Sequence, residues 1–332
     1  MRYSLIALAA GAAILMSGCS HKEVFKPDNV KGEWRNAGHL SASIRQVSPS
    51  AAVLENGNLL SGEGEKKFKL PAGHRLINLS GGWVITESAE GNLVLSPLEE
   101  GTESVTFEVK RGIAAATVQE GIVAVLFVNN EMALYSLDSK KLLFKESSNP
   151  PVAVDARIAN PFFLKELVLF LTLDGKIVIV NSETKQVLRS VVVSSEEYFN
   201  NITYLNVIDN HLVASTGYGV LALSQKEGRE KYDIRNIAYT AEGIWITTKQ
   251  GEIIALTPTL QLRAKKKFPF AHFVGISVQN DRVYVLEKEG YMIALSKNLL
   301  EYDVYDVDMQ DDNTIFVGEG RFYFDDRYIN IK

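Results

Sequence analysis

The feature that most constrains the fold is a short phrase that returns along almost the whole chain. At each return, a turn residue is followed by a run in which apolar and polar residues alternate, as in GNLVLS and GKIVIVN. The turn residues are Gly57, Gly91, Asn130, Gly175, Gly219, Gly251, Gly290 and Gly320. Their spacing averages about 38 residues, close to the period of a four-stranded propeller blade. The repeat therefore predicts eight stacked blades.

Each repeat can be divided into four strands. Around Gly251, the runs IRNIAYT, IWITTKQ, EIIALT and LQLRAKKKF supply an inner, a second, a third and an outer strand. Lys265 to Lys267 in the outer run are typical of a solvated edge, where lysine blocks unwanted strand pairing. One blade cannot bury both of its faces alone, whereas a closed ring of blades can. We therefore expect an all-β, single-domain, eight-bladed β-propeller of four-stranded antiparallel blades over residues 42–332.

Residues 1–18 have the pattern of an export signal. Arg2 gives a positive start, Leu5 to Met16 is apolar, and small residues precede Cys19. This apolar run is too short to cross a bilayer core of about 30 Å as a helix. The alternative is a buried N-terminal helix. The stretch Leu15-Met16-Ser17-Gly18-Cys19 resembles a bacterial lipobox, which implies cleavage before Cys19 and lipidation of that cysteine.

Cys19 is the only cysteine in the chain, so no internal disulfide is possible, and lipidation explains its presence in an exported protein. In the bacterial lipoproteins that this stretch resembles, a serine after the cysteine implies delivery to the outer membrane, with the protein on the periplasmic face. Residues 19–41 are polar, lack periodicity and include proline and glycine. They predict a lipid-anchored tether that leads to the propeller.

The run NSETKQVLR is similar to the quinoprotein-type repeat D-x-x-T-G-x-x-x-W. Asn181 and Thr184 retain two positions in kind, while Lys185 replaces the glycine and Arg189 the tryptophan. ALYSLDSKKLLF looks like a copy one residue shorter. On these residues the chain resembles the quinoprotein-like (PQQ-repeat) eight-bladed propellers.

Within that fold the chain resembles the BamB family of outer-membrane lipoproteins, which share its lipobox and tether. Pyrroloquinoline quinone dehydrogenases also have the fold, but no motif here places their calcium, catalytic aspartate or cofactor-sandwiching groups. The resemblance to BamB implies no cofactor and a scaffold role in the machinery that inserts β-barrel proteins into the outer membrane.

The short motifs of catalysis and metal binding are missing from the sequence. The histidines lack metal-ligand spacing, and HExxH, GxSxG and P-loop motifs are absent. An acidic stretch offers calcium the carboxylates of Asp306, Asp308, Asp311 and Asp312, but without the glycine and spacing of an EF-hand, so a solvated face is favoured. A net charge of −5 argues against nucleic acid and against contact with lipid other than through the anchor. We expect no metal, no cofactor and no enzymatic activity.

The two longest intervals of the repeat bracket Gly175 and contain insertions over residues 147–166 and 194–204. Insertions in repeat proteins become loops, often on the binding face, and aromatic residues and arginine dominate interface hot spots. We therefore predict partner binding by Arg157, Phe162, Phe163, Tyr198, Phe199, Asn200 and Asn201. Because the insertions belong to neighbouring blades, one joined surface is expected. The alternative is that the phenylalanines pack under their own loops.

Together these features predict a non-catalytic, protein-binding scaffold anchored to the outer membrane, with envelope proteins as partners. The barrel assembly machinery is the partner that the resemblance implies. Two alternatives stay open: a periplasmic propeller that binds a small molecule or cofactor, and an accessory protein for maturation of another envelope enzyme.

Overall fold

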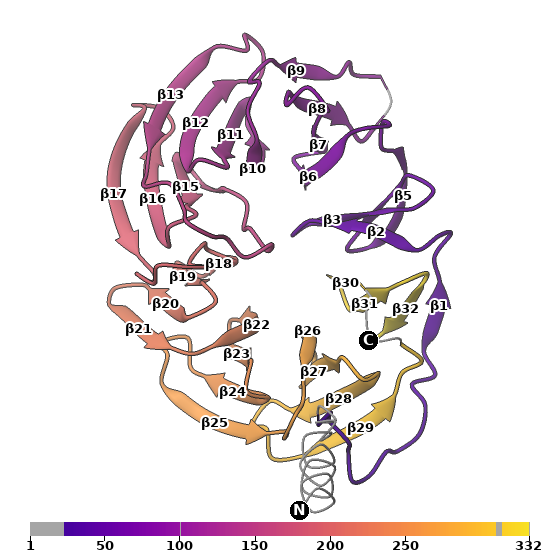
Figure 1. The fold of residues 1–332 in the computed structure, drawn as a ribbon. Helices are drawn as coiled ribbons and strands as arrows, with labels where there is room; N and C mark the ends of the chain where they lie inside the picture. The colour runs from indigo at the N-terminus through magenta and orange to yellow at the C-terminus, as the bar shows by residue number, and fades with distance from the viewer. Residues whose placement is uncertain (1–22, 100, 310–313, 332) are drawn as a thin grey trace, which may run out of the picture.

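The computed structural model describes residues 23–99, 101–309 and 314–331, where the regular secondary structure consists of β-strands arranged in eight four-stranded sheets. The sheets stand side by side as blades of a closed ring (Figure 1). This confirms the predicted all-β, eight-bladed propeller with antiparallel blades. Residues 1–18, Cys19, Asp311 and Asp312 lie outside the described residues, so the predictions made for them stay predictions.

The first four blades run from residue 44 to residue 192. Blade 1 comprises β2 (Ile44–Val47), β3 (Ala51–Leu54), β4 (Asn58–Ser61) and β5 (Gly64–Lys69). Blade 2 comprises β6 (Arg75–Ser80), β7 (Trp83–Glu87), β8 (Leu93–Pro97) and β9 (Val105–Phe107). Blade 3 comprises β10 (Ile113–Gln119), β11 (Ile122–Phe127), β12 (Glu131–Ser136) and β13 (Leu142–Ser147). Blade 4 comprises β14 (Phe162–Leu164), β15 (Leu167–Leu171), β16 (Lys176–Asn181) and β17 (Gln186–Val192).

The other four blades complete the ring. Blade 5 comprises β18 (Tyr204–Ile208), β19 (His211–Ser215), β20 (Gly219–Leu223) and β21 (Glu227–Lys231). Blade 6 comprises β22 (Ile234–Thr240), β23 (Gly243–Thr248), β24 (Glu252–Leu256) and β25 (Leu262–Lys267). Blade 7 comprises β26 (Phe273–Gln279), β27 (Arg282–Glu287), β28 (Tyr291–Ser296) and β29 (Tyr302–Asp306). Blade 8 comprises β30 (Ile315–Gly318), β31 (Arg321–Phe324), β32 (Arg327–Asn330) and β1 (Ala37–His39).

In blades 1 to 7 the strands follow chain order from the channel to the rim, so the four-strand division around Gly251 is confirmed, with the lysine run on the outer strand β25 (Figure 1). Blade 8 differs from the expected division. Its outer strand is β1, which pairs with β32 from the other end of the chain, Ala37 opposite Ile329. The turn at Gly320 therefore joins the first and second strands of its blade, not the second and third.

The expected tether also differs from the structure, because the chain packs on the propeller from its first described residues. Phe25 is buried between Phe268 and Tyr291, with its ring edge-on to both. Further along, Trp34 donates hydrogen bonds from its backbone N–H to the carbonyl of Asp306 at 2.8 Å and from Nε1 to the carbonyl of Asn330 at 2.9 Å. Residues 23–41 thus follow the rims of blades 7 and 8 as an attached strap (Figure 1).

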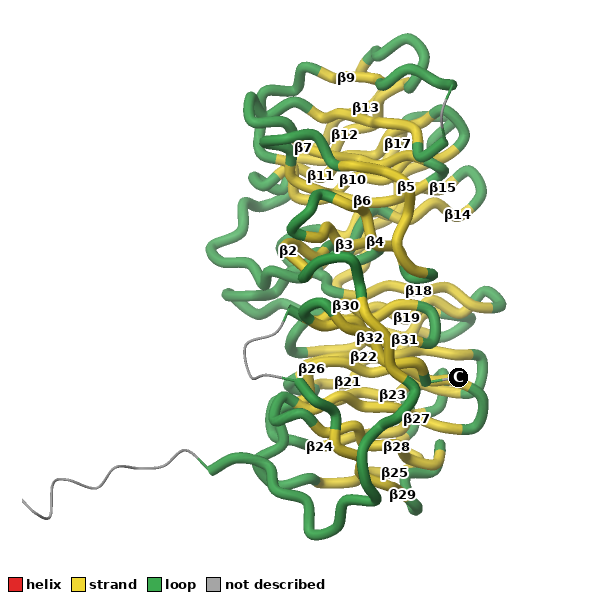
Figure 2. The backbone as a smooth tube through the Cα atoms, turned by 90° about the vertical axis from the view of Figure 1, so that its right-hand side faces the viewer, coloured by secondary structure: helices red, strands yellow, loops and turns green. Residues whose placement is uncertain are grey.

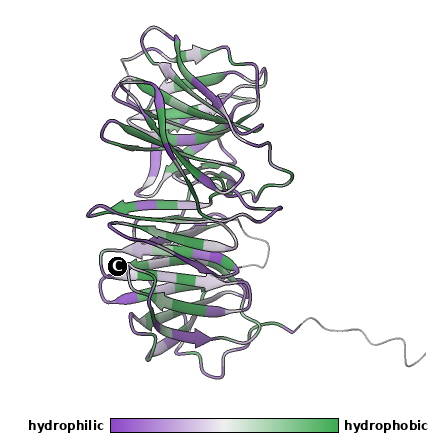
Figure 3. Cartoon of the chain, turned by 90° about the vertical axis from the view of Figure 1, so that its left-hand side faces the viewer, coloured by the Kyte–Doolittle hydropathy of each residue, from purple (hydrophilic) through white to green (hydrophobic). Residues whose placement is uncertain are grey.

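The hydrophobic core is divided among the contacts between blades. Each pair of neighbouring blades encloses its own apolar cluster, for example Trp245 of blade 6 with Phe273 of blade 7, and Phe322 of blade 8 with Met292 of blade 7. The coloured cartoon shows the apolar residues running through the stacked sheets (Figure 3). A blade is therefore stabilised by its neighbours, as the repeat implied.

The degenerate repeat motif has a structural counterpart in the turn between β16 and β17. Asn181 Oδ1 accepts hydrogen bonds from the backbone N–H groups of Glu183 at 2.9 Å and Thr184 at 2.7 Å. Lys185, which replaces the glycine of the repeat, has a φ of 60°, the left-handed conformation that glycine adopts most readily. The backbone of the repeat is kept although its sequence has drifted.

The connections between blades, as far as the structure describes them, lie on one side of the disc, which we call the connection face. Each runs from an outer strand past the second turn of its own blade to the next inner strand, as when the Val193 N–H donates to the Gly175 carbonyl. Edge-on views show these connections on one side of the disc, where the described part of the chain also begins (Figures 2 and 3). This face therefore carries both insertions and the start of the strap. In the described part of the chain, no helix is long and apolar enough to cross a bilayer.

Candidate functional site

The two insertions form one surface on the connection face. The first joins β13 to β14 and the second joins β17 to β18. Their backbones are hydrogen-bonded to each other: Ala159 N–H donates to the Ile202 carbonyl at 3.0 Å, and Phe199 N–H donates to the Ala153 carbonyl at 3.0 Å. Neighbouring blades thus bring together loop residues that lie 43 and 46 positions apart in the sequence, as expected of insertions in neighbouring blades.

Asn200 and Asn201 are buried and hold this surface from below. Asn201 is 0% exposed; its Oδ1 accepts a hydrogen bond from the backbone N–H of Asp155 at 2.6 Å, and its Nδ2 donates to the carbonyl of Arg157 at 2.7 Å. Asn200 Nδ2 donates to the carbonyl of Ser194 at 2.9 Å. Neither side chain can touch a partner directly. Their part in the site is to position the loops, which differs from the direct contact we expected.

Phe162 and Phe163 are half-buried because they lie on the inner strand β14 and not in the loop before it. Phe162 packs in the cluster between blades 4 and 5, and Phe163 in the cluster between blades 3 and 4. Alternation along a strand sends the two rings to opposite faces of the blade. These rings join blades, and each is only partly exposed.

Tyr198 and Phe199 are the expected aromatic site residues that are exposed, at 48% and 49%. The first loop sets Val152, 69% exposed, and Val154 beside them, two positions that the sequence did not single out. We call Val152, Val154, Tyr198 and Phe199 the loop patch. Phe199 has a φ of 52°, an uncommon conformation for a bulky residue, which its backbone bond to Ala153 maintains. Exposed apolar groups on a fixed backbone are typical of a protein-binding surface.

A polar network around Asp174 holds the base of the first loop. Its carboxylate accepts hydrogen bonds from Asn130 Nδ2 at 2.9 Å, Ser148 Oγ at 3.0 Å and Thr172 Oγ1 at 2.7 Å, and pairs with Lys176 Nζ at 2.6 Å. Burial raises the pKa of Asp174, but these bonds outweigh burial and hold the pKa below its ordinary value. Asn130 belongs to blade 3 and Asp174 to blade 4, so the network joins the blades directly beneath the loop.

Arg157 lies where the loop surface meets the central channel. Its Nε donates to Asp155 Oδ1 at 2.9 Å, its Nη2 to Asp155 Oδ2 at 2.6 Å, and its Nη1 to the carbonyl of Arg235. Burial raises the pKa of Asp155, but the hydrogen bonds and charge of Arg157 outweigh it and keep the carboxylate ionised. This pair is largely self-satisfied, so Arg157 offers a partner less charge than its sequence position suggested.

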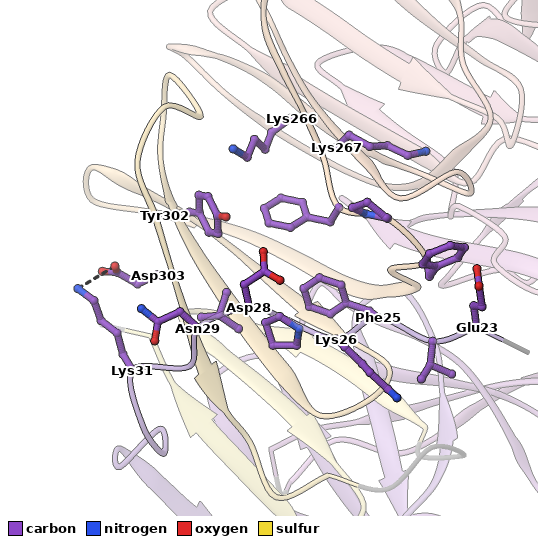
Figure 4. Close-up of a pocket in the computed structure, with 16 residues that line it drawn as sticks. Glu23, Phe25, Lys26, Asp28, Asn29, Lys31, Lys266, Lys267, Tyr302 and Asp303 are labelled. Carbon is purple, nitrogen blue, oxygen red and sulfur yellow. Dashed lines mark ion pairs between the residues drawn. The ribbon is translucent and has the colours of Figure 1, made fainter.

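A groove of about 900 Å³ lies between the strap and blades 6 and 7 (Figure 4). Phe25 sits at its floor, Lys266 and Lys267 come from the edge strand β25, and Lys31 pairs with Asp303 Oδ1 at 2.8 Å. Lys266 Nζ lies 4.6 Å from the centre of the Tyr302 ring. We interpret the groove as the seam along which the strap attaches to the ring.

The acidic stretch enters ion pairs in its described part. Asp303 pairs with Lys31 and Arg282, and Asp308 with Arg327. Over residues 23–99, 101–309 and 314–331, no group of three or more His, Cys, Asp or Glu side chains is placed to hold a metal ion.

Comparison with known proteins places the fold among characterised propellers. The family described as outer membrane protein assembly factor BamB matches residues 42–297. Plasminogen-binding protein PgbB of Helicobacter pylori strain J99 is 27% identical, over 96% of this chain and 70% of its own length. The crystal structure of BamB from Moraxella catarrhalis superposes with a TM-score of 0.67 at 14% identity, over 89% of this chain and 98% of that one. The computationally designed protein Ika8 superposes with a TM-score of 0.62 at 13% identity, over 90% and 99%. Structural likeness at such identity shows the fold alone.

Proposed function

Because this chain belongs to the outer membrane protein assembly factor BamB family, we propose that it is a non-catalytic propeller that binds other proteins of the cell envelope. The observation that carries the proposal is the loop patch. It presents two aromatic and two aliphatic side chains on loops whose backbones are hydrogen-bonded to each other, so little conformational entropy is lost when a partner binds.

The finer proposal concerns place and partner. We propose that Cys19 carries a lipid that anchors the protein to the periplasmic face of the outer membrane, where it serves the assembly of β-barrel proteins. The family's printed description and the lipobox-like sequence support this. The strap begins on the connection face, so a lipid attached four residues before Glu23 would hold that face and its loop patch near the membrane surface.

A second candidate function rests on the relatives from Helicobacter pylori, which are named for binding plasminogen and align with nearly the whole chain. In that case the propeller would bind a soluble extracellular protein. The same patch would serve either partner, because an exposed aromatic pair does not define the partner's identity.

The test is cross-linking in intact cells through a photoreactive residue at position 199, with position 270 as the matched control. Phe270 is also an exposed phenylalanine with a positive φ, at 58% exposure and 61°, in the connection between blades 6 and 7. Capture of a barrel-assembly component at 199 and not at 270 supports the finer proposal. Capture of purified plasminogen at 199 supports the second candidate. Equal capture at both positions, or none, contradicts the assignment of binding to the loop patch.

A further inference from the structure

A cavity of about 380 Å³ lies against the wall of the central channel, apart from the exposed loop patch. The inner strands β18, β22 and β26 form most of its lining, with Val317 of β30 and Arg157 of the first loop at its borders. Its polar groups include the guanidinium of Arg235 and the hydroxyls of Thr240 and Ser277. The proposed scaffold role makes no use of this cavity.

Two arginines border the cavity, and they differ in whether an acidic side chain pairs with them. Arg157 uses its donors on Asp155 and on the carbonyl of Arg235. The guanidinium of Arg235 is half-buried, and among the described residues it has no hydrogen-bond acceptor and no ion-pair partner. Asp155 is close enough to act on Arg235 through its charge, but both of its oxygens are bonded to Arg157. A partly buried cation without a partner is costly unless a ligand supplies the negative charge.

The backbone is irregular at Arg235. The pairing of β22 with β23 shifts between Ile234 and Asn236, so Arg235 is the extra residue of a β-bulge. Such bulges redirect a side chain and recur beside binding sites. The same irregularity occurs in the inner strands β2, β6, β10 and β26, and in β2 its extra residue is Arg45, between Ile44 and Gln46. Arg45 is exposed and is not part of the described lining of the cavity, so the bulge alone does not make a site.

We propose that the channel cavity binds a small oxyanion ligand, a carboxylate or a phosphate, with Arg235 as the principal contact. The planar guanidinium of an arginine can donate two parallel hydrogen bonds to two oxygens of a carboxylate or a phosphate. The charge of such a ligand would balance that of Arg235 without any further acidic side chain. The site is separate from the loop patch, because its ligand would bind inside the channel and not on the outer surface.

The experiment is isothermal titration calorimetry of the full-length purified protein at low ionic strength. Two probes are titrated separately, inorganic phosphate and succinate. We expect saturable binding of at least one probe at one site per chain. Arg235→Gln should weaken that binding at least tenfold, and the matched control Arg45→Gln should leave it within twofold. The tighter probe identifies the oxyanion class. Saturable binding of neither probe, or equal weakening in both variants, overturns the proposal.

A second variant keeps the test decisive if Arg235→Gln folds poorly. Arg235→Lys retains the positive charge without the planar guanidinium, so we expect a loss of affinity of threefold or more at an unchanged melting temperature. Wild-type affinity in Arg235→Lys would overturn the assignment of the guanidinium as the contact. Cross-linking at position 199 reads a different surface, so either proposal can fail while the other stands.

Discussion

The Oδ1 atom of Asn201 accepts a hydrogen bond from the backbone N–H of Asp155 at 2.6 Å, so a buried side chain of one loop fixes the backbone of another loop forty-six residues away. The amide of Asn201 also donates to the carbonyl of Arg157 at 2.7 Å. The exposed residues of the loop patch owe their fixed positions to these bonds. The residue that determines the surface is thus one that no partner can touch.

Asn201→Ala should loosen the loops and destabilise the protein. The change leaves the Asp155 N–H and the Arg157 carbonyl without their partner in a dry site, which costs on the order of 1–3 kcal/mol. Urea unfolding followed by circular dichroism would measure the loss, and hydrogen exchange over residues 152–157 should become faster. The exposed Asn29 provides the control, because Asn29→Ala should change neither quantity. Unchanged exchange in Asn201→Ala would contradict this role.

Replacing both aromatic residues of the loop patch by serine should reduce partner binding and leave stability nearly unchanged. Tyr198 and Phe199 are about half exposed, so little buried area is lost in the free protein. Truncation of an aromatic hot spot commonly costs 2 kcal/mol or more of binding energy, roughly thirtyfold. Affinity for the cross-linked partner, measured by biolayer interferometry, checks this. Phe270→Ser should bind as the wild type does, and equal binding by the double variant would rule out the patch.

The fold was predictable from the sequence wherever a blade is one continuous stretch of chain. Turn residues such as Gly91, Gly175 and Gly251 lie between the second and third strands of their blades, as the repeat predicted. The prediction was wrong at Gly320, because the outer strand of blade 8 comes from residues 37–39. Three residues, Ala-Gly-His, carry no alternation, and their pairing partner lies almost 300 residues away. Ring closure is a long-range event that a local pattern does not record.

Gly38→Ala should weaken that closure. Gly38 lies opposite Tyr328 in the pairing of β1 with β32, and a Cβ at this position would overlap the Tyr328 ring. The ring or the strand must move, at a cost of about 1–3 kcal/mol, typical of overpacking. Gly228, also in an outer strand, has ordinary space around it, so Gly228→Ala is the matched control. The midpoints of urea unfolding should separate the two variants, and coincident midpoints would contradict the overlap.

The free energy of unfolding should fall as the pH rises through the range in which Glu287 titrates. Burial raises the pKa of Glu287 to about 7, although the backbone N–H groups of His272 and Glu289 donate to its carboxylate at 2.9 and 2.7 Å. Between the ordinary value of 4.5 and about 7, the folded protein holds a proton that the unfolded chain releases. The stabilisation is complete below pH 4.5, declines as the pH rises towards 7, and is absent above that range.

Glu287→Gln removes this titration, so its free energy of unfolding should vary less than that of the wild type between pH 5 and pH 8. Urea unfolding at several pH values in this range measures the slope. Glu183→Gln, at an exposed position, should keep the wild-type slope. A wild-type slope in Glu287→Gln would assign the pH dependence to another group.

For the candidate site, the sequence located the loops but not the roles of their residues. Interval lengths and aromatic content identified Tyr198 and Phe199, which are exposed. Phe162 and Phe163 also looked like loop aromatics, but Pro161 ends the loop and the inner strand begins at Phe162. Arg235 was not singled out because it appeared as an ordinary strand residue, and only the assembled ring places it on the lining of the channel cavity. Burial and register depend on contacts between blades, which a single sequence does not contain.

Because Phe25 is buried against the propeller, only the few residues before it could act as a flexible link to a lipid on Cys19. Cys19 lies only four positions before Glu23, and an extended chain covers at most about 3.6 Å per residue, so a lipid on Cys19 would be joined to the described chain by at most roughly 14 Å of backbone. A propeller anchored in this way would stay close to the membrane. It would remain in a thin layer next to the bilayer. There it would meet a partner embedded in the membrane by diffusion in two dimensions, and not by diffusion in three.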